Sequence, residues 1–287
     1  MSNIFKTTLL LTGMTLLLML AGRAFGGQRG MLMALAFAAV LNFVSYFFSD
    51  KIALATYRAQ PVGRDDLPRV YNIVERLAQK VSLPMPKVYL IPSDSPNAFA
   101  TGRNPNHASV AVTQGILGLL NDDELEGVLA HELGHVRNRD ILISSIAATL
   151  AGAITYLASI ARWGMIFGGM RGSRDRDGGG GIAAIAMIFL APFAAMLIQL
   201  AVSRSREYGA DDTGAHWTGN PYALASALAK IDAYSRQRPL VASPSTAHLF
   251  IIQPFLGGMS FGNLFSTHPP TAKRIERLTG RPAEFTQ

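Results

Sequence analysis

The chain alternates between long apolar runs and segments whose apolar residues follow a helical or strand period. Two apolar runs, 4–21 and 30–49, stand at its start and are separated by a short connection from Arg23 to Arg29. At about 1.5 Å per residue, each run is long enough to cross the roughly 30 Å hydrocarbon layer of a membrane. The pattern predicts a transmembrane hairpin in residues 1–50. The first run alone is also compatible with a cleaved signal peptide.

The next segment, 51–140, has the pattern of a water-soluble domain. Apolar residues recur with a helical period over 67–81, and the opposite face is polar, which predicts an amphipathic helix. Three short β-rich segments follow, separated by Pro, Asn and Gly, and they predict a small sheet with tight turns. These segments are 87–91, 98–101 and 108–113.

A capping-box pattern, Asn121 with Glu124 three residues later, predicts the start of another helix. This helix contains an H-E-x-x-H pattern formed by His131, Glu132 and His135. Positions four apart lie on one face of a helix, so both histidines can direct a ring nitrogen at the same metal ion. The carboxylate of Glu132 then lies beside the ion, where a zinc peptidase has its general base.

Two further apolar runs, 141–160 and 182–202, enclose a Gly-rich loop at 170–181 and predict a second transmembrane hairpin within 141–203. If the metal-binding helix continues into the first of these runs, the run begins only about 9 Å along the axis from His135. The metal would then lie at the membrane surface. A proline and a glutamine interrupt the last run, so a kinked span and a buried core hairpin both remain open.

Composition supports a membrane protein, because 49% of the 287 residues are hydrophobic and only 16% are charged. The formal net charge is +7, but the basic residues flank apolar runs and form no stripe with aromatic residues. This distribution favours lipid headgroups over nucleic acid as partners. The chain has no cysteine, so a zinc ion would be held by nitrogen and oxygen ligands alone.

The last segment, 204–287, follows the fourth apolar run and contains predicted helices at 221–235 and 269–278. Glu207 stands at the same membrane boundary as His135, and Asp211 follows it on the same helix face. Glu207 could be the third metal ligand, and Asp211 could accept the second ring N–H of a ligand histidine. Spacing alone leaves open that both are solvated charges balancing nearby arginines.

Four separated motifs together resemble the HtpX family of membrane-bound zinc metalloproteases, gluzincin-clan relatives of the CAAX prenyl protease. The motifs are H-E-L-G-H at 131–135, R-E-Y-x-A-D at 206–211, N-A-F-A-T-G at 97–102 and T-H-P-P at 267–270. The resemblance implies a mainly α membrane protein with four transmembrane helices and a cytosolic α+β zincin-like metalloprotease domain with a small β-sheet. The Gly-rich stretch at 178–181 matches no motif of the family.

The resemblance also implies roles for individual residues. It makes Glu207 the third ligand of one zinc ion per chain, and it puts the strand that contains the Asn-Ala-Phe-Ala stretch beside the metal, where an extended substrate adds as a further strand. The expected substrate-binding residues are Asn97, Ala98, Phe99 and Ala100. Asn97 could instead be an ordinary turn residue. His268 could donate to the oxyanion or simply begin a helix, and Arg274 could belong to the active site or to a solvated face.

We therefore expect a zinc endopeptidase of the bacterial inner membrane, with its catalytic domain and both termini in the cytoplasm. The family resemblance implies that its substrates are misfolded or damaged membrane proteins. Two alternatives are a non-catalytic zinc-stabilised membrane scaffold or chaperone and a CAAX-type prenyl-protein protease. A structural zinc site has no need of a carboxylate at Glu132, and a prenyl protease would be expected to have more spans.

Overall fold

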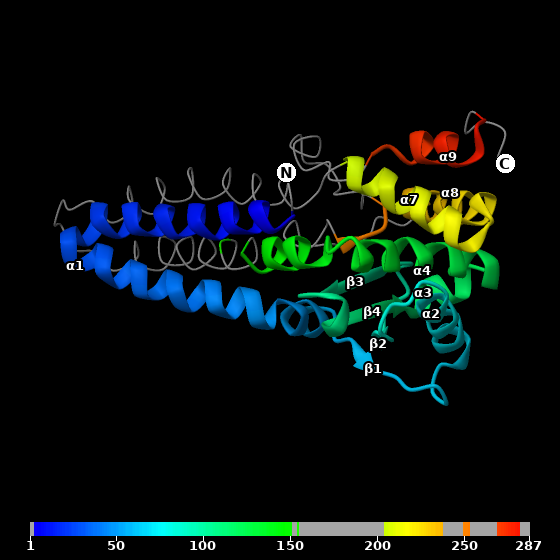
Figure 1. Ribbon diagram of the computed structural model, residues 1–287, viewed down its shortest axis with the longest axis horizontal. Coiled ribbons are helices and arrows are strands. Elements are labelled where there is room, and N and C mark those ends of the chain that lie inside the picture. The colour runs from blue at the N-terminus through cyan, green and yellow to red at the C-terminus, as the bar shows by residue number, and fades with distance from the viewer. Residues whose placement is uncertain (1–2, 151–153, 155–203, 238–248, 253–268, 282–287) are drawn as a thin grey trace.

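The computed structural model describes residues 3–150, 154, 204–237, 249–252 and 269–281 (Figure 1). Several predicted features lie outside the described residues. They are the Gly-rich loop at 170–181, the apolar run 182–202, most of the run 141–160, and His268.

Helix α1 (Asn3–Thr56) forms the predicted N-terminal hairpin from two halves that run side by side (Figure 1). The helical path breaks at Gly26 and Gly27, inside the connection expected from the sequence. Gly27 has φ 59° and ψ −143°, a conformation that strains any residue with a side chain. Across the hairpin, the Asn42 side-chain amide donates to the Thr15 hydroxyl at 2.9 Å, so a polar contact ties the two halves together.

The apolar helices differ in length. Among the described residues, Gly26–Thr56 is long and apolar enough to cross a membrane, whereas Phe5–Leu20 and Ile141–Leu150 are shorter apolar helices. Leu10 of the first half of α1 packs in one buried cluster with Ile146 of the apolar helix Ile141–Leu150. The described residues therefore contain one clear apolar span, with two shorter apolar helices packed together beside it.

The soluble region contains a small mixed sheet, and its three predicted strands are confirmed. The strands are β1 (Gln60–Pro61), β2 (Lys87–Ile91), β3 (Ala98–Gly102) and β4 (Ala108–Thr113). Their order in the sheet is β1-β2-β4-β3, with β2 and β4 parallel and the other neighbours antiparallel. Strand β3 is therefore an edge strand, and its backbone is paired with a neighbouring strand on one side only.

Helices lie in layers beside the β3 edge of this sheet (Figure 1). Helix α4 contacts β3, α7 and α8 pack on α4, and α9 lies against α7 and α8. Three further helices lie close to the sheet in sequence. Helix α2 precedes β2, a short 3-10 helix connects β3 to β4, and α3 follows β4. The bounds are α2 (Pro68–Lys80), Pro105–His107 for the 3-10 helix, α3 (Gln114–Leu119), α4 (Asp122–Arg137), α7 (Arg204–Thr218), α8 (Pro221–Gln237) and α9 (Thr271–Thr279). Because a single apolar cluster joins α2, the sheet, α4 and α8, the soluble region shares a common core.

The predicted capping box begins α4. The Asn121 side chain accepts the Glu124 N–H at 2.9 Å, and the Glu124 carboxylate accepts the Asn121 N–H at 2.9 Å. The same buried carboxylate accepts hydrogen bonds from Ser226 at 2.6 Å and Lys230 at 2.8 Å, both on α8. Burial opposes its ionisation, but these hydrogen bonds outweigh burial and hold the pKa of Glu124 below its usual range. One ionised side chain therefore caps α4 and joins it to α8.

We predict that Glu124→Gln lowers the free energy of unfolding by about 1–2 kcal/mol at pH 7. Because the folded-state pKa is lowered, the charged form stabilises the fold above the ordinary glutamate pKa. That contribution is lost as the pH falls through the folded-state pKa, so the two proteins should converge in acid. Denaturation in detergent across this pH range measures the difference. The control is Glu126→Gln, which also changes a glutamate of α4 but removes only an exposed ion pair with Arg76 of α2. It should lower the free energy of unfolding much less.

Candidate metal centre and active site

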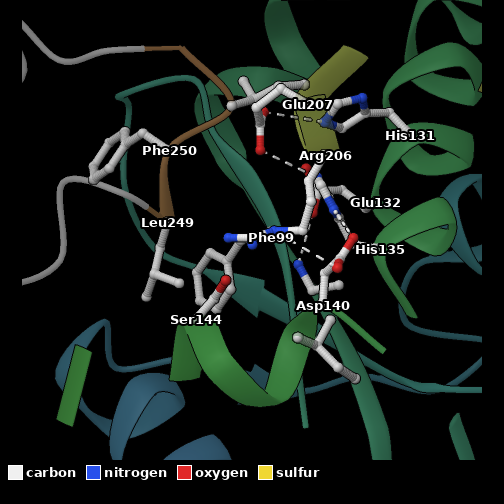
Figure 2. A pocket seen from close by; sticks show the side chains of 13 residues that line it. Phe99, His131, Glu132, His135, Asp140, Ser144, Arg206, Glu207, Leu249 and Phe250 are labelled. Carbon is white, nitrogen blue, oxygen red and sulfur yellow. Dashed lines mark hydrogen bonds and ion pairs between the residues drawn. The ribbon is translucent and has the colours of Figure 1, made fainter. Parts of the chain in front are cut away.

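Helices α4 and α7 bring the three predicted metal ligands together (Figure 2). The Nε2 atom of His131 lies 3.8 Å from Oε2 of Glu207, and the Nε2 atom of His135 lies 3.6 Å from its Oε1. One ligand atom from each residue falls within 4.8 Å of the others. A tetrahedral zinc ion with bonds of about 2.0–2.1 Å holds its ligands about 3.3 Å apart. The three side chains therefore fit a zinc ion with little movement.

The approach of α7 to α4 depends on a glycine. A Cβ atom at Gly214 would lie only 3.0 Å from the backbone nitrogen of His131. On the opposite helix, Gly134 faces Thr213 and Ala210, where a Cβ atom would meet the Thr213 side chain at 3.4 Å. Small residues at these crossings let the two backbones pack closely enough for Glu207 to reach both histidines.

Each ligand histidine has an aspartate at its other ring nitrogen. The Nδ1 atom of His131 lies 2.9 Å from Asp211, as predicted for that residue, and the Nδ1 atom of His135 lies 3.2 Å from Asp140. An aspartate in this position fixes the tautomer with the proton on Nδ1, which leaves Nε2 as the metal-binding atom. Both Nε2 atoms are the ones that face Glu207, so ring orientation and ligand geometry agree.

The metal-binding helix does not continue into the third apolar run, so the possibility of one continuous helix, left open from the sequence, is not realised. Helix α4 ends at Arg137, Arg139 has a left-handed φ of 57°, and the next helix begins at Ile141. The Asp140 N–H donates to the carbonyl of His135 at 2.9 Å. The break has a structural reason, because this turn brings the Asp140 carboxylate back to the His135 ring.

Glu132 lies beside the ligands and against the edge strand. Its Oε2 accepts the N–H of Ala100 at 2.9 Å, so this amide points away from β4, toward the site. Burial raises the pKa of Glu132 above its usual range; the two neighbouring imidazoles oppose the rise, and Glu207 adds to it. A raised pKa brings a carboxylate closer to the pH at which it can both accept and donate a proton.

The pKa of His135 is also raised. Burial disfavours its charged form, but the hydrogen bond to Asp140 and the charges of Glu207 and Glu132 outweigh this effect and raise the pKa of His135 to about 9. A proton on the ring competes with a metal ion for Nε2. Zinc binding at this site should therefore weaken as the pH falls.

The pocket over these residues has one apolar side (Figure 2). Phe99, Leu249 and Phe250 line that side together with Ile141, the first residue of the apolar helix Ile141–Leu150, and Ser144 of the same helix also lines the pocket. Of the expected substrate-binding residues, Phe99 and Ala100 line the pocket and Ala98 is fully buried in β3.

Asn97 is neither an exposed turn residue nor one of the residues that line the pocket. Its side chain is buried, accepts the N–H of Ile251 at 3.1 Å and donates to the carbonyl of Leu249 at 3.4 Å. Direct contact between Asn97 and a substrate stays a prediction.

Sequence reasoning missed several residues of the site. Asp140 had a local signal, since an Asp directly before a new apolar helix is a frequent start residue. Arg274, left open from the sequence, is buried and bonded to Asp211. The segment Leu249–Ile252 had no signal, because nothing in an apolar stretch indicates which region of the fold it will contact.

Two histidines and a glutamate that fit one zinc ion, with a second glutamate next to them, define a zinc metallopeptidase of the H-E-x-x-H type. Comparison with known proteins agrees. Residues 65–282 match peptidase family M48, and the chain belongs to that family.

Similar proteins place it among the HtpX homologs of the family, which confirms the resemblance found in the motifs. The chain is 58% identical to "Protease HtpX homolog" of Desulforapulum autotrophicum, covering 97% of this chain and 90% of that one. It is 58% identical to the homolog of Syntrophobacter fumaroxidans, with 97% and 99% covered, and 55% identical to that of Pyrococcus furiosus, with 95% and 94% covered.

A solved structure shares the fold. The crystal structure of S. mikatae Ste24p aligns with a TM-score of 0.53 at 19% identity. The alignment covers 96% of this chain but only 65% of that protein. At this identity the similarity extends to the fold and not to the substrate.

We predict that Asp140→Asn weakens zinc binding by about 10-fold to 100-fold, because the neutral side chain no longer stabilises the Nδ1 proton of His135. Competition with a chromogenic chelator in detergent measures the dissociation constant. Asp123→Asn, an exposed change on α4, is the matched control. Equal zinc affinity in the wild type, Asp140→Asn and Asp123→Asn would exclude a supporting role for Asp140.

Proposed function

We propose that this metallopeptidase is a membrane-embedded endopeptidase that cleaves misfolded or damaged membrane proteins at the cytoplasmic face. The observation that carries the proposal is the position of the pocket relative to the apolar helices. Ile141 and Ser144, at the start of an apolar helix, line the pocket. Tyr57, directly after the long apolar helix, has its ring 5.4 Å from that of Phe99. An active site at this boundary suits polypeptide that emerges from a bilayer.

The chemistry follows from the residues around the pocket. His131, His135 and Glu207 would hold zinc, which supplies Lewis-acid chemistry that polarises a carbonyl and acidifies water. Glu132 takes the proton from the attacking water and then donates it to the leaving amine. The hydrogen bond from Ala100 keeps the Glu132 carboxylate against the edge strand, next to the bond that is cleaved.

The edge strand supports substrate binding through the backbone. β3 pairs with β4 on one side only, and the Ala100 N–H points to the other side. Strand alternation directs the backbone groups of Ala98 to that same side. An extended substrate segment that adds as a further strand would pair with the backbone of Ala98, while the Ala100 N–H stays bonded to Glu132. Such pairing selects for unfolded polypeptide more than for sequence.

We predict that Glu132→Gln lowers kcat at least about 100-fold while zinc stays bound, because only the proton transfer is lost. Casein cleavage in detergent and zinc content measured on the same samples separate the two effects. Glu207→Ala is the matched comparison, since it should lose zinc and activity together. Near wild-type cleavage by Glu132→Gln would contradict the mechanism.

The choice of substrate is tested in proteoliposomes. A membrane protein destabilised by mutation should be cleaved faster than its folded parent, and cleavage should disappear with Glu132→Gln. The proposed substrate class would be overturned if the wild-type protease cleaved a C-terminally farnesylated peptide but cleaved neither form of the membrane protein.

Four spans would place both hairpin turns on the side of the membrane opposite the active site. The absence of cysteine makes this testable with single-cysteine variants. A membrane-impermeant maleimide added to intact spheroplasts should label Gln28→Cys and Ser173→Cys, but not Ala272→Cys on α9. Labelling of Ala272→Cys, or protection of Ser173→Cys until the cells are lysed, would contradict the arrangement.

A further inference from the structure

Arg274 of α9 lies fully buried behind the metal-binding residues, with 1% of its surface exposed. Its Nε and Nη2 atoms donate to the two oxygens of Asp211 at 2.8 and 2.6 Å. Its Nη1 atom donates to the carbonyl of Ile251 at 2.7 Å. The planar guanidinium group therefore contacts two different regions of the site at once, which a single ammonium group could not do.

The first contact supports the metal ligand His131. Both oxygens of Asp211 accept hydrogen bonds from Arg274, and Oδ1 also lies 2.9 Å from Nδ1 of His131. Arg274 thus fixes the aspartate that orients the ring.

The second contact supports the pocket wall, by which we mean residues Leu249, Phe250 and Ile251. All three line the pocket. Asn97 binds the Ile251 N–H and the Leu249 carbonyl, while Arg274 binds the Ile251 carbonyl. The peptide groups of the wall are therefore held from the edge strand on one side and from α9 on the other. The Phe250 ring lies 6.2 Å from the ring of Tyr57, the residue directly after α1.

We infer that Arg274 is a positioning residue that couples the zinc ligand His131 to the substrate-facing wall at Ile251. The inference rests on the proposed zinc ligands and on the pocket as the substrate site. Loss of Arg274 loosens the metal support and the wall together. Loss of Asn97 loosens the wall alone, whereas loss of the Asp211 charge acts on the metal support directly and also leaves the buried Arg274 guanidinium without its charged partner.

The same pair of helices contains a matched control. Arg277, one turn after Arg274, pairs with Asp212, the neighbour of Asp211, at 2.8 Å. Both side chains of this second pair are about half exposed, at 51% and 53%, and neither lines the pocket. Arg277→Gln therefore removes an arginine–aspartate pair between α9 and α7 without touching the metal support or the wall.

The test compares Arg274→Gln, Arg274→Lys, Asn97→Ala, Asp211→Asn and Arg277→Gln in the full chain in detergent. Four quantities are measured for each: the zinc dissociation constant by chelator competition, KM and kcat on a fluorogenic peptide at saturating zinc, and the melting temperature. We expect Arg274→Gln to weaken zinc binding about 10-fold to 100-fold and to raise KM about tenfold.

The other variants separate the two contacts. Arg274→Lys should recover much of the zinc affinity through its charge near Asp211, but it should keep the raised KM. Asn97→Ala should raise KM with zinc affinity unchanged. Asp211→Asn should weaken zinc binding at least as much as Arg274→Gln does, and should raise KM by no more than that variant, because Arg274 remains present to bind Ile251. Arg274→Gln and Asn97→Ala combined should raise KM by less than the product of the single effects, because both act on the same wall.

The inference is overturned if Arg274→Gln changes only the melting temperature, as Arg277→Gln would, or if zinc saturation restores its KM to the wild-type value. If Arg274→Gln does not fold, Arg274→Lys and Asn97→Ala decide, and a wild-type KM in Arg274→Lys overturns the inference. Failure of the proposed function is distinct: the wild type would then bind no zinc, or Glu132→Gln would remain active.

Discussion

The close packing of α7 on α4 is the contact on which the metal site depends. The two histidines come from one helix, but the third ligand arrives from a helix far away in the sequence, and Gly214 lets the backbones approach closely enough for Glu207 to complete the set. The same packing brings Asp211 to the His131 ring. Ligand geometry, tautomer control and the link to α9 therefore all follow from one interface between helices.

The edge strand and the apolar helices determine what can reach this centre. Strand β3 lies beside α4 with one unpaired edge, and the Ala100 amide already contacts Glu132. A hydrogen bond of 2.7 Å between Thr101 and Ser145 fastens this strand to the apolar helix that follows the metal-binding helix. The catalytic groups thus lie at the end of the apolar helices, and the proposed substrate rests on this position.

Two arginine–aspartate pairs stand behind the two histidines, but they differ in surroundings. Arg274 and Asp211 are fully buried, and Arg274 also reaches the wall at Ile251. Asp140, 3.6 Å from Arg206, lies at the pocket itself, after the break that ends α4. A buried charge is tolerated only when it is paired and hydrogen-bonded, so the geometry of the inner pair is strongly constrained.

The sequence by itself determined the elements whose signals are local. Helical spacing predicted that His131 and His135 share a face, and the capping box predicted the start of α4. Short β-rich segments separated by turn residues predicted the strands. The sequence also identified Glu207 as the third metal ligand once its four motifs were compared with those of a known family. The end of α4 before Asp140 is a local feature too. Only the tertiary structure decided that Asn97 holds the pocket wall and that Arg274 is buried. These outcomes depend on contacts between segments distant in the chain, and neither helical nor strand periodicity carries information about such contacts.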